Sequence, residues 1–427
     1  MSIENDLQEL QEAGIINKDT ALAIRSYYSQ TGNTTSNRLL LVFGILGALL
    51  IGLGVILIVA HNWDNLGRTT KTILAFLPLI IGQIACAFFI FKKPDSLPWK
   101  EASGTFLFLA VGACIALISQ IYHLPGEMSS FILCWALLCL PIIYVLPSST
   151  ASLLYLLAVS SYAMSSSWDS SATYSPLLYW PLLAAVAPYY YFLIKNKARS
   201  NFTHFHHWAI PLSLIIGLFT FADSSLYWQS VNSILLFASF YLIGSLPHFE
   251  NKKIWHHGYT LLGLLGTLRI LFTFSFDWLW KDLRRDNFDW YELLSSTEFV
   301  ASIVLLAITM YLLFMRYRAK DVAGINLISI SFLFFIPVFV LGFYSGVAPV
   351  FINTWILLIG VTTIWQGAKS DSLAKLNLGL LIITVLIACR FFDTDVSFLI
   401  RGLIFLSIGI GFFGANYWLL KKRNGDA

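Results

Sequence analysis

The sequence predicts an all-α protein, a polytopic bundle of about 14 transmembrane helices after a short N-terminal helical hairpin. Of the 427 residues, 57% are hydrophobic and only 12% are charged, about half the charged share of a soluble domain. The mean hydropathy is +0.73. Backbone in hydrocarbon must satisfy its own hydrogen bonds, so spanning runs must be helical. The lipid bilayer is therefore the first predicted partner, and the modest net charge of +4 does not indicate nucleic acid.

The first 37 residues are predicted to form a short cytoplasmic helical hairpin. Ile3 and Leu10 belong to an apolar repeat with helical spacing, and Gly14 ends it because glycine readily adopts the conformation that terminates helices. Asn17 then offers a side chain suited to capping a second helix. Residues 1–37 are interpreted either as a cap packed on the membrane domain or as a docking segment for a cytoplasmic partner.

From Leu39 onward, apolar runs follow one another along the chain. The first run comes after a polar segment and is too long for the core of a signal peptide, so we expect the N-terminus to stay in the cytoplasm. The transmembrane bundle is predicted over 38–420, and a basic cytoplasmic tail follows over 421–427. The predicted spans are 39–60, 72–91, 102–121, 128–146, 150–165, 176–194, 207–222, 231–247, 254–275, 298–315, 322–342, 348–366, 373–390 and 398–420.

The distribution of Lys and Arg predicts the orientation of the bundle. With the N-terminus inside, nineteen of these residues fall on the inner side and seven on the outer side, and Arg269 lies within a span. Cytoplasmic loops of membrane proteins carry such an excess of positive charge. Both termini are therefore predicted inside.

This orientation brings four polar stations to the external side. They end the first, third and thirteenth spans and begin the last one. Ionisable groups at the membrane boundary are costly, so they usually pair or serve function. The candidate site residues in these stations are Asp64, Gln120, Tyr122, His123, Glu127, Arg390, Asp393, Asp395 and Arg401.

We interpret the stations as one outward-facing polar pocket that binds substrate or relays protons. The substrate would be bound, or protons relayed, by Gln120, Tyr122, His123 and Glu127. The residues of the other stations would complete the wall of the pocket. The alternative at each station is structural: interfacial anchors, or an ion pair of Arg390 with a nearby aspartate. No compact metal-binding motif and no catalytic residue is identified, and the sequence names no cofactor.

Two polar residues and one row of small residues lie inside the predicted spans. Gln83 and Arg269 are polar residues inside spans, and they indicate either a solute path or, as we favour, hydrogen bonding within the bundle. Gly44, Ala48 and Gly52 are spaced four apart, which predicts close helix packing on one face.

The longest outer connection, 276–297, mixes aromatic, basic and acidic residues. An amphipathic segment at the membrane interface is one interpretation, and a lid over a binding site is the other.

Parts of the sequence resemble the bacterial membrane proteins called domain of unknown function 2157. The resemblance rests on the Gly-rich first span closing with Ala60-His61-Asn62-Trp63-Asp64, on the run from Gly112 to Leu124, and on the C-terminal Arg390, Asp393-Thr394-Asp395 and Arg401-Gly402-Leu403-Ile404-Phe405. It covers about the first third and the last tenth of the chain. It implies a multi-pass protein of the bacterial cytoplasmic membrane and supplies no reaction.

Three functions remain open from the sequence. The first is a carrier or lipid-handling protein that binds a small solute or lipid in the outward-facing pocket. The second is a membrane enzyme acting on a lipid-linked substrate at the outer face. The third is an assembly partner that uses residues 1–37. A deep lateral opening to lipid beside Glu127 would favour the enzyme, whereas a closed, water-lined pocket would favour the carrier.

Overall fold

The structure is a computed structural model, and most of its described residues are helical. These are residues 7, 10–11, 13–61, 66–168, 172–221, 226–246, 258–285, 290–318, 326–393, 406, 409–410 and 413–414. No strand occurs within these ranges, which confirms the all-α fold class. Within the described ranges, seven helical segments are long and apolar enough to cross a membrane, or eight if one bent pair is counted as a span. One of the seven is Pro176–Asn196, which is made of three shorter helices. The predicted runs up to 373–390 overlap helices, although the helix in the run 322–342 covers only Ser331–Tyr344, and the total of about 14 spans is not confirmed.

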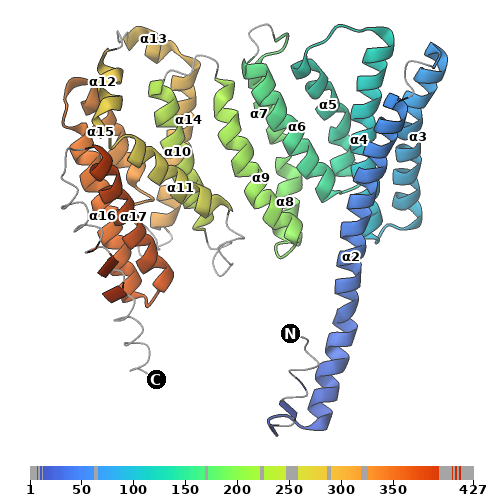
Figure 1. Cartoon of the computed structure of the whole chain (residues 1–427), viewed down its shortest axis with the longest axis horizontal. Helices are drawn as coiled ribbons and strands as arrows, with labels where there is room; N and C mark the ends of the chain where they lie inside the picture. Colours follow the sequence, from blue (N-terminus) through green and yellow to red (C-terminus); the bar gives the residue numbers. More distant parts are fainter. Residues whose placement is uncertain are drawn as a thin grey trace. The chain divides into compact units, whose positions relative to one another are not determined.

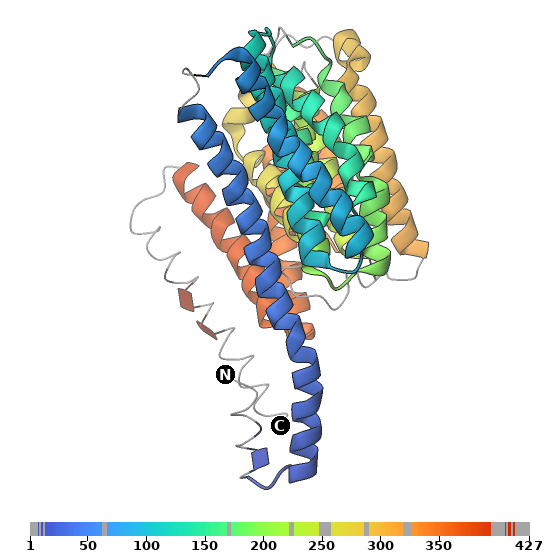
Figure 2. The same ribbon diagram turned by 90° about the vertical axis from the view of Figure 1, so that its right-hand side faces the viewer.

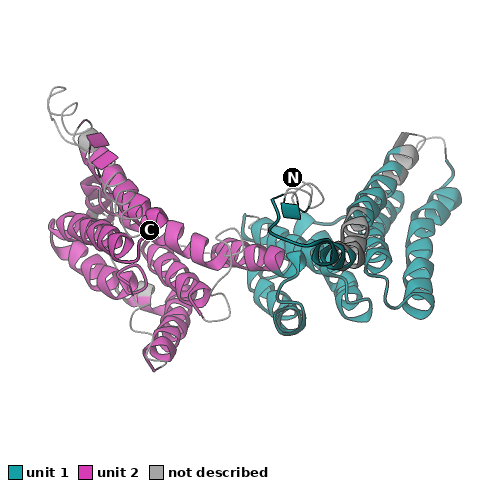
Figure 3. Ribbon diagram, turned by 90° about the horizontal axis from the view of Figure 1, so that it is seen from below, with its two compact units in different colours: residues 1–203 teal, residues 204–427 magenta. Residues whose placement is uncertain are grey.

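The chain divides into two compact units, residues 1–203 and 204–427 (Figure 3). In unit 1, α2 and α3 pack against α4, and α5 packs against α6 (Figure 1). Its helices are α2 (Lys18–His61), α3 (Arg68–Lys92), α4 (Leu97–Tyr122), α5 (Met128–Val145), α6 (Ser149–Trp168), η2 (Pro176–Leu178), α7 (Tyr179–Ala184) and α8 (Ala187–Asn196).

The N-terminal segment turns at Gly14, as the sequence predicts. The helix that follows the turn does not end near residue 37, where the sequence predicts its end. Gly14 has a φ of 70° and follows helical residues, and the Asn17 side chain accepts a hydrogen bond of 2.8 Å from the Thr20 amide. From Lys18 the helix α2 continues for 44 residues into the first predicted span, past the ends of its neighbours α3 and α4 (Figures 1 and 2). The boundary expected near residue 37 therefore lies inside one helix, although Gly32 and a run of residues that often begin or end helices come just before it.

Small residues bring α2 close to α4, as their spacing predicts. A Cβ atom on Gly44 would lie 3.7 Å from the Cβ of Ala102. Ala48, one turn further, is 8% exposed. Helices in membranes associate through such small-residue faces because they allow the backbones to approach.

Unit 2 contains α9 (Asn201–Gly217), which begins just before the boundary, and a set of helices around α10. There α10 packs against α11 and α14, and α16 packs against α17. The helices that follow α9 are η3 (Leu218–Thr220), α10 (Leu226–Gly244), α11 (Gly258–Thr273), α12 (Asp277–Arg285), α13 (Trp290–Ser295), α14 (Thr297–Arg318), α15 (Ser331–Tyr344), α16 (Ala348–Lys369) and α17 (Leu373–Asp393).

The chain bends by 71° between α11 and α12. Trp280 on α12 is fully buried, and its indole Nε1 donates a 2.8 Å hydrogen bond to the carbonyl of Phe274 at the bend. The same indole packs over Gly342 of α15. This first part of the predicted outer connection 276–297 is thus an amphipathic helix that packs into the unit, because its tryptophan needs both an apolar neighbour and a hydrogen-bond acceptor.

Candidate functional site

The stretch 119–127 connects α4 to α5, and α4 ends there in a Schellman motif. The amide of Leu124 donates to the carbonyl of Ser119 at 2.9 Å, and that of His123 donates to Gln120 at 3.4 Å. His123 takes the left-handed position with a φ of 50°, where glycine is the commonest residue. The exposed His123 therefore has a structural place at a helix cap, which the sequence alone did not reveal.

Tyr122 links the C-terminal end of α4 to the start of α3. Its hydroxyl shares a 3.2 Å hydrogen bond with the hydroxyl of Thr72, and the Arg68 guanidinium lies 5.8 Å from the centre of its ring. Tyr122 is nevertheless 47% exposed, and Gln120 is exposed as well. The contacts fit an aromatic anchor at the membrane interface, the structural alternative considered for this station.

Glu127 joins the start of α5 to the segment after α6. One carboxylate oxygen accepts from the Thr173 hydroxyl at 3.1 Å, and the other accepts from the Thr173 amide at 2.8 Å and from the Ser129 hydroxyl at 3.4 Å. Both oxygens are therefore engaged by neighbouring groups of the protein. A carboxylate held in this way fastens two connections that lie 46 residues apart in the sequence.

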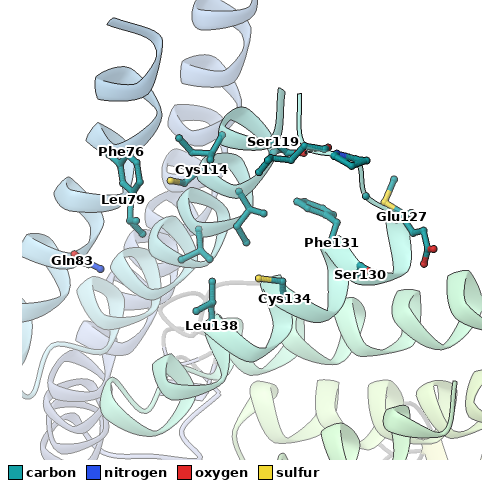
Figure 4. A pocket seen from close by; sticks show the side chains of 18 residues that line it. Phe76, Leu79, Gln83, Cys114, Ser119, Glu127, Ser130, Phe131, Cys134 and Leu138 are labelled. Carbon is teal, nitrogen blue, oxygen red and sulfur yellow. Dashed lines mark hydrogen bonds between the residues drawn. The ribbon is translucent and has the colours of Figure 1, made fainter. Parts of the chain in front are cut away.

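A cavity of about 830 Å³ lies between α3, α4 and α5, directly beside this connection. Its walls are mainly apolar, and the polar groups come from Gln83, Ser119, Glu127 and Ser130. Figure 4 shows Phe131 and Cys134 reaching from α5 toward Cys114, with Glu127 at the opposite edge from Gln83 of α3. Gln120, Tyr122 and His123 are not among the lining residues, and their role in binding stays a prediction.

Gln83 does not form the hydrogen bonds within the bundle that we favoured from the sequence. Its side chain is exposed at the cavity, and among the described residues it has no hydrogen-bonding partner. The reason is that α4 presents apolar side chains to this part of α3, with Leu107 and Phe106 nearest to the neighbouring Gly82. The other interpretation, a polar residue on a solute path, fits this position better.

A second polar centre in unit 1, around Glu101, is absent from the sequence predictions. Glu101 on α4 is fully buried, and its carboxylate accepts from the Ser148 hydroxyl at 2.7 Å, the Ser149 amide at 2.9 Å and the Thr150 amide at 2.8 Å. It thus satisfies free amides at the start of α6. The sequence does contain a sign of this contact. Glu101 lies at the start of one apolar span, and serines lie at the start of another.

The two ends of unit 1 are therefore held by different polar contacts. Glu101 acts where α4 and α6 begin, whereas Glu127 acts where α4 ends and where the chain leaves α6. Helices α4, α5 and α6 consequently run alternately up and down. This alternation agrees with the order of spans predicted from the sequence.

The other polar stations do not all fall on described residues. Asp64, Asp395 and Arg401 lie outside them, and the side chain of Asp393 is not described. Arg390 belongs to unit 2, where its Nη2 donates to the Ser275 hydroxyl at 3.1 Å and its guanidinium lies 4.6 Å from the ring centre of Phe276. The union of all four stations in one pocket stays a prediction.

Side chains that could bind a metal ion were sought among the described residues. Among them, no group of three or more His, Cys, Asp or Glu side chains is placed to hold a metal ion. The histidines His204 and His207, on α9, have ring centres 6.0 Å apart, and His207 lies 6.2 Å from the ring of Tyr259. They pack as aromatic residues between helices.

Comparisons with known proteins complete this description. No curated protein and no solved structure matches the chain. A family match covers most of unit 1, including the connection 119–127 and Glu101, and it does not extend to the C-terminal residues of the resemblance. Residues 8–152 match the family of predicted membrane proteins DUF2157, which confirms over this part of the chain the resemblance stated from its sequence.

Proposed function

We propose that this protein handles lipids, holding the apolar chain of a lipid in the cavity between α3, α4 and α5. The observation that carries the proposal is the combination of mainly apolar walls with a polar edge in a volume of about 830 Å³. Ligand sites commonly have this size, and they combine apolar walls with a few polar groups that orient the ligand.

The depth of the cavity supports a ligand from one leaflet. Its α5 wall extends from Met128 to Leu138, which corresponds to about 15 Å along the helix. This is about half of the roughly 30 Å hydrocarbon thickness of a bilayer. The cavity thus has the depth of a single acyl chain that enters from the side of the connection 119–127.

The surroundings of the cavity favour access from the bilayer. Phe76, Leu124, Met128 and Leu138 line it and are 42%, 55%, 65% and 56% exposed. In a spanning bundle such apolar surface faces hydrocarbon. Ser119 and Ser130 would then meet the polar part of an amphipathic ligand.

A lateral, mainly apolar opening beside Glu127 argues against a closed, water-lined solute carrier. It is the feature expected of a membrane enzyme acting on a lipid-linked substrate, and that function remains the second candidate. The engaged carboxylate of Glu127 favours binding over catalysis, because Thr173 and Ser129 already occupy its oxygens.

The proposal is tested by filling the cavity. Cys134 is exposed and lines it, so Cys134→Trp should block the site, whereas Leu137→Trp places the same bulk on an exposed position of α5 outside the lining. Protein in vesicles is crosslinked with a phosphatidylglycerol that carries a diazirine in its acyl chain, and modified peptides are quantified by mass spectrometry. We expect crosslinks to α4 and α5 that fall severalfold in Cys134→Trp alone.

A chemical version of the test avoids a folding defect. Wild-type protein is purified, and Cys134 is alkylated with a bulky apolar maleimide before reconstitution. Loss of crosslinking after alkylation supports the proposal. Equal crosslinking in untreated, alkylated and Cys134→Trp protein would remove the basis for a lipid site here.

We also infer that the protein resides in the bacterial cytoplasmic membrane with both termini inside. The excess of Lys and Arg in alternate connections supports this orientation. Single cysteines at positions 64, 127 and 395 should react with an impermeant thiol reagent added to intact cells, and cysteines within 195–199 should not. The reverse pattern would invert the orientation.

Residues 1–37 remain a proposed docking segment for a cytoplasmic partner. Lys18, Asp19 and Thr20 at the start of α2 are exposed. Deletion of residues 1–30 tests this role through the loss of a co-purifying protein, while lipid crosslinking is unchanged.

A further inference from the structure

The bend between α11 and α12 borders a second cavity, which lies entirely in unit 2 and is separate from the lipid site. Its volume is about 160 Å³, and α9, η3, α10, α11 and α12 contribute to its lining. One water needs only roughly 10–15 Å³ of such space. The cavity therefore has room for a small organic group.

Arg269 supplies the charge in this cavity. It lies in the last turns of α11, is exposed at the cavity, and has no ion-pair or hydrogen-bonding partner for its side chain among the described residues. None of the described residues that line the cavity is acidic. Asp277, at the start of α12, instead bonds Lys281 at 2.7 Å and lies 3.8 Å from Arg284.

An arginine in a spanning segment is costly, so it normally has a counter-ion or a polar partner. The sequence favoured hydrogen bonding within the bundle for Arg269, and the structure shows no such bond in the described part of the chain. The positive charge is therefore available to a ligand.

Uncharged polar side chains line the same cavity, among them Gln229, Ser230 and Ser233 of α10 and Thr273 of α11. Gln229 and Ser233 line the cavity, and the described residues offer their side chains no hydrogen-bonding partner. They add an amide and a hydroxyl as donors beside the guanidinium. The rest of the lining, including Phe237 and Ile270, is mainly apolar.

The bend itself is held in place by side chains. The indole of Trp280 binds the carbonyl of Phe274, and the amide of Asn353 donates to the carbonyl of Ser275 at 3.0 Å. A break within a membrane helix is tolerated where its backbone is bound by protein or lines a cavity. The site therefore rests on a fixed framework.

From these observations we propose that the cavity binds the oxyanion group of a small organic acid, with Arg269 as the principal ligand. A planar guanidinium matches the two oxygens of a carboxylate or phosphate in a bidentate pair. Gln229 and Ser233 donate additional hydrogen bonds, and the apolar lining contacts the body of the acid. The oxyanion is carried either by a free carboxylate or by the headgroup of an anionic lipid.

The probe for a free acid is sodium benzoate, titrated into detergent-solubilised protein with sodium chloride at equal ionic strength as the reference. Thermal unfolding is followed by tryptophan fluorescence. A saturable rise in Tm is expected for wild type. Arg269→Gln should weaken the apparent affinity about tenfold or more, and Arg269→Lys should weaken it less. The matched control is Arg318→Gln, an exposed arginine of α14 outside the cavity.

The probe for a lipid headgroup is phosphatidylglycerol. The protein is reconstituted in mixed phosphatidylcholine and phosphatidylglycerol and purified again, and native mass spectrometry counts the phosphatidylglycerol molecules that it retains. Phosphatidylglycerol retention that depends on Arg269, without a benzoate effect, assigns the oxyanion to a lipid. If Arg269→Gln does not fold, Gln229→Ala and Ser233→Ala serve as milder variants. The proposal is overturned if neither anion distinguishes wild type from these variants.

Discussion

Glu101 should contribute more to the stability of unit 1 than any other acidic residue described there. It is fully buried, and three donors converge on its carboxylate: the Ser148 hydroxyl and the amides of Ser149 and Thr150. Hydrogen bonds to a charged group contribute about 1.5–3 kcal/mol each, and they are not additive. Glu101→Ala removes all three and leaves two amides at the start of α6 without an acceptor. We therefore expect a loss of about 3–5 kcal/mol in the free energy of unfolding.

Glu101→Gln retains one carbonyl oxygen in nearly the same volume, and the Ser148 hydroxyl can rotate to accept from the new amide. About one donor is then left unsatisfied, so the expected loss is roughly 1–3 kcal/mol. The order of stability is wild type, then Glu101→Gln, then Glu101→Ala. Asp95→Ala provides the matched control, because Asp95 is exposed in the connection before α4.

Two measurements check this prediction. Thermal unfolding in detergent should lower Tm by about 10 °C for Glu101→Ala, given roughly 2–4 °C per kcal/mol for a unit of this size. Hydrogen exchange at Ser149 and Thr150 should accelerate in both variants at temperatures where the protein is still folded. An unfolding temperature for Glu101→Ala equal to that of Asp95→Ala, with unchanged exchange, would refute the assignment of these contacts as stabilising.

The remaining predictions concern three other positions. His123→Gly should keep or raise the free energy of unfolding, by up to about 1 kcal/mol, because glycine adopts the left-handed conformation without strain, whereas His123→Val should lower it. The two variants are compared by their Tm, and a lower Tm for His123→Gly than for His123→Val would contradict this reasoning. Gly342→Ala should lower Tm by several degrees because its methyl group meets the buried ring of Trp280, and Gly346→Ala, whose nearest neighbour would lie at 3.9 Å, should be tolerated. In the folded protein, Cys134 should react with an apolar thiol reagent before the buried cysteines do, as measured by mass spectrometry, and equal rates would contradict the described cavity.

The sequence predicted the features that depend on local composition. The helical membrane bundle, the turn at Gly14 and the close packing at Gly44 follow from hydropathy, glycine conformation and small side chains, and the structure confirms them, although it does not confirm the number of spans. The continuity of α2 was missed because a polar segment gives no sign that a helix continues from it into a span. The predicted boundary at residue 37 was placed where the apolar run begins.

The contacts within the candidate site depend on residues far apart in the chain. Nothing in the local sequence connects Glu127 to Thr173, or Glu101 to Ser148, because the residues of each pair meet only after the helices between them have packed. Arg269 and Gln83 were correctly singled out as unusual, but whether a polar residue in a span meets a partner or a cavity depends on the facing helices. The shared position of the polar stations remains a prediction from orientation alone.

The unbroken course of α2 has a mechanical consequence. At 1.5 Å per residue, its 44 residues form a rod of about 66 Å, roughly twice the thickness of the hydrocarbon layer. Because the helix is continuous, twisting of its N-terminal half would turn the half that contacts α4 at Gly44. A single residue inserted near position 30 would turn the two halves by about 100° relative to each other, while leaving every side chain of the bundle unchanged.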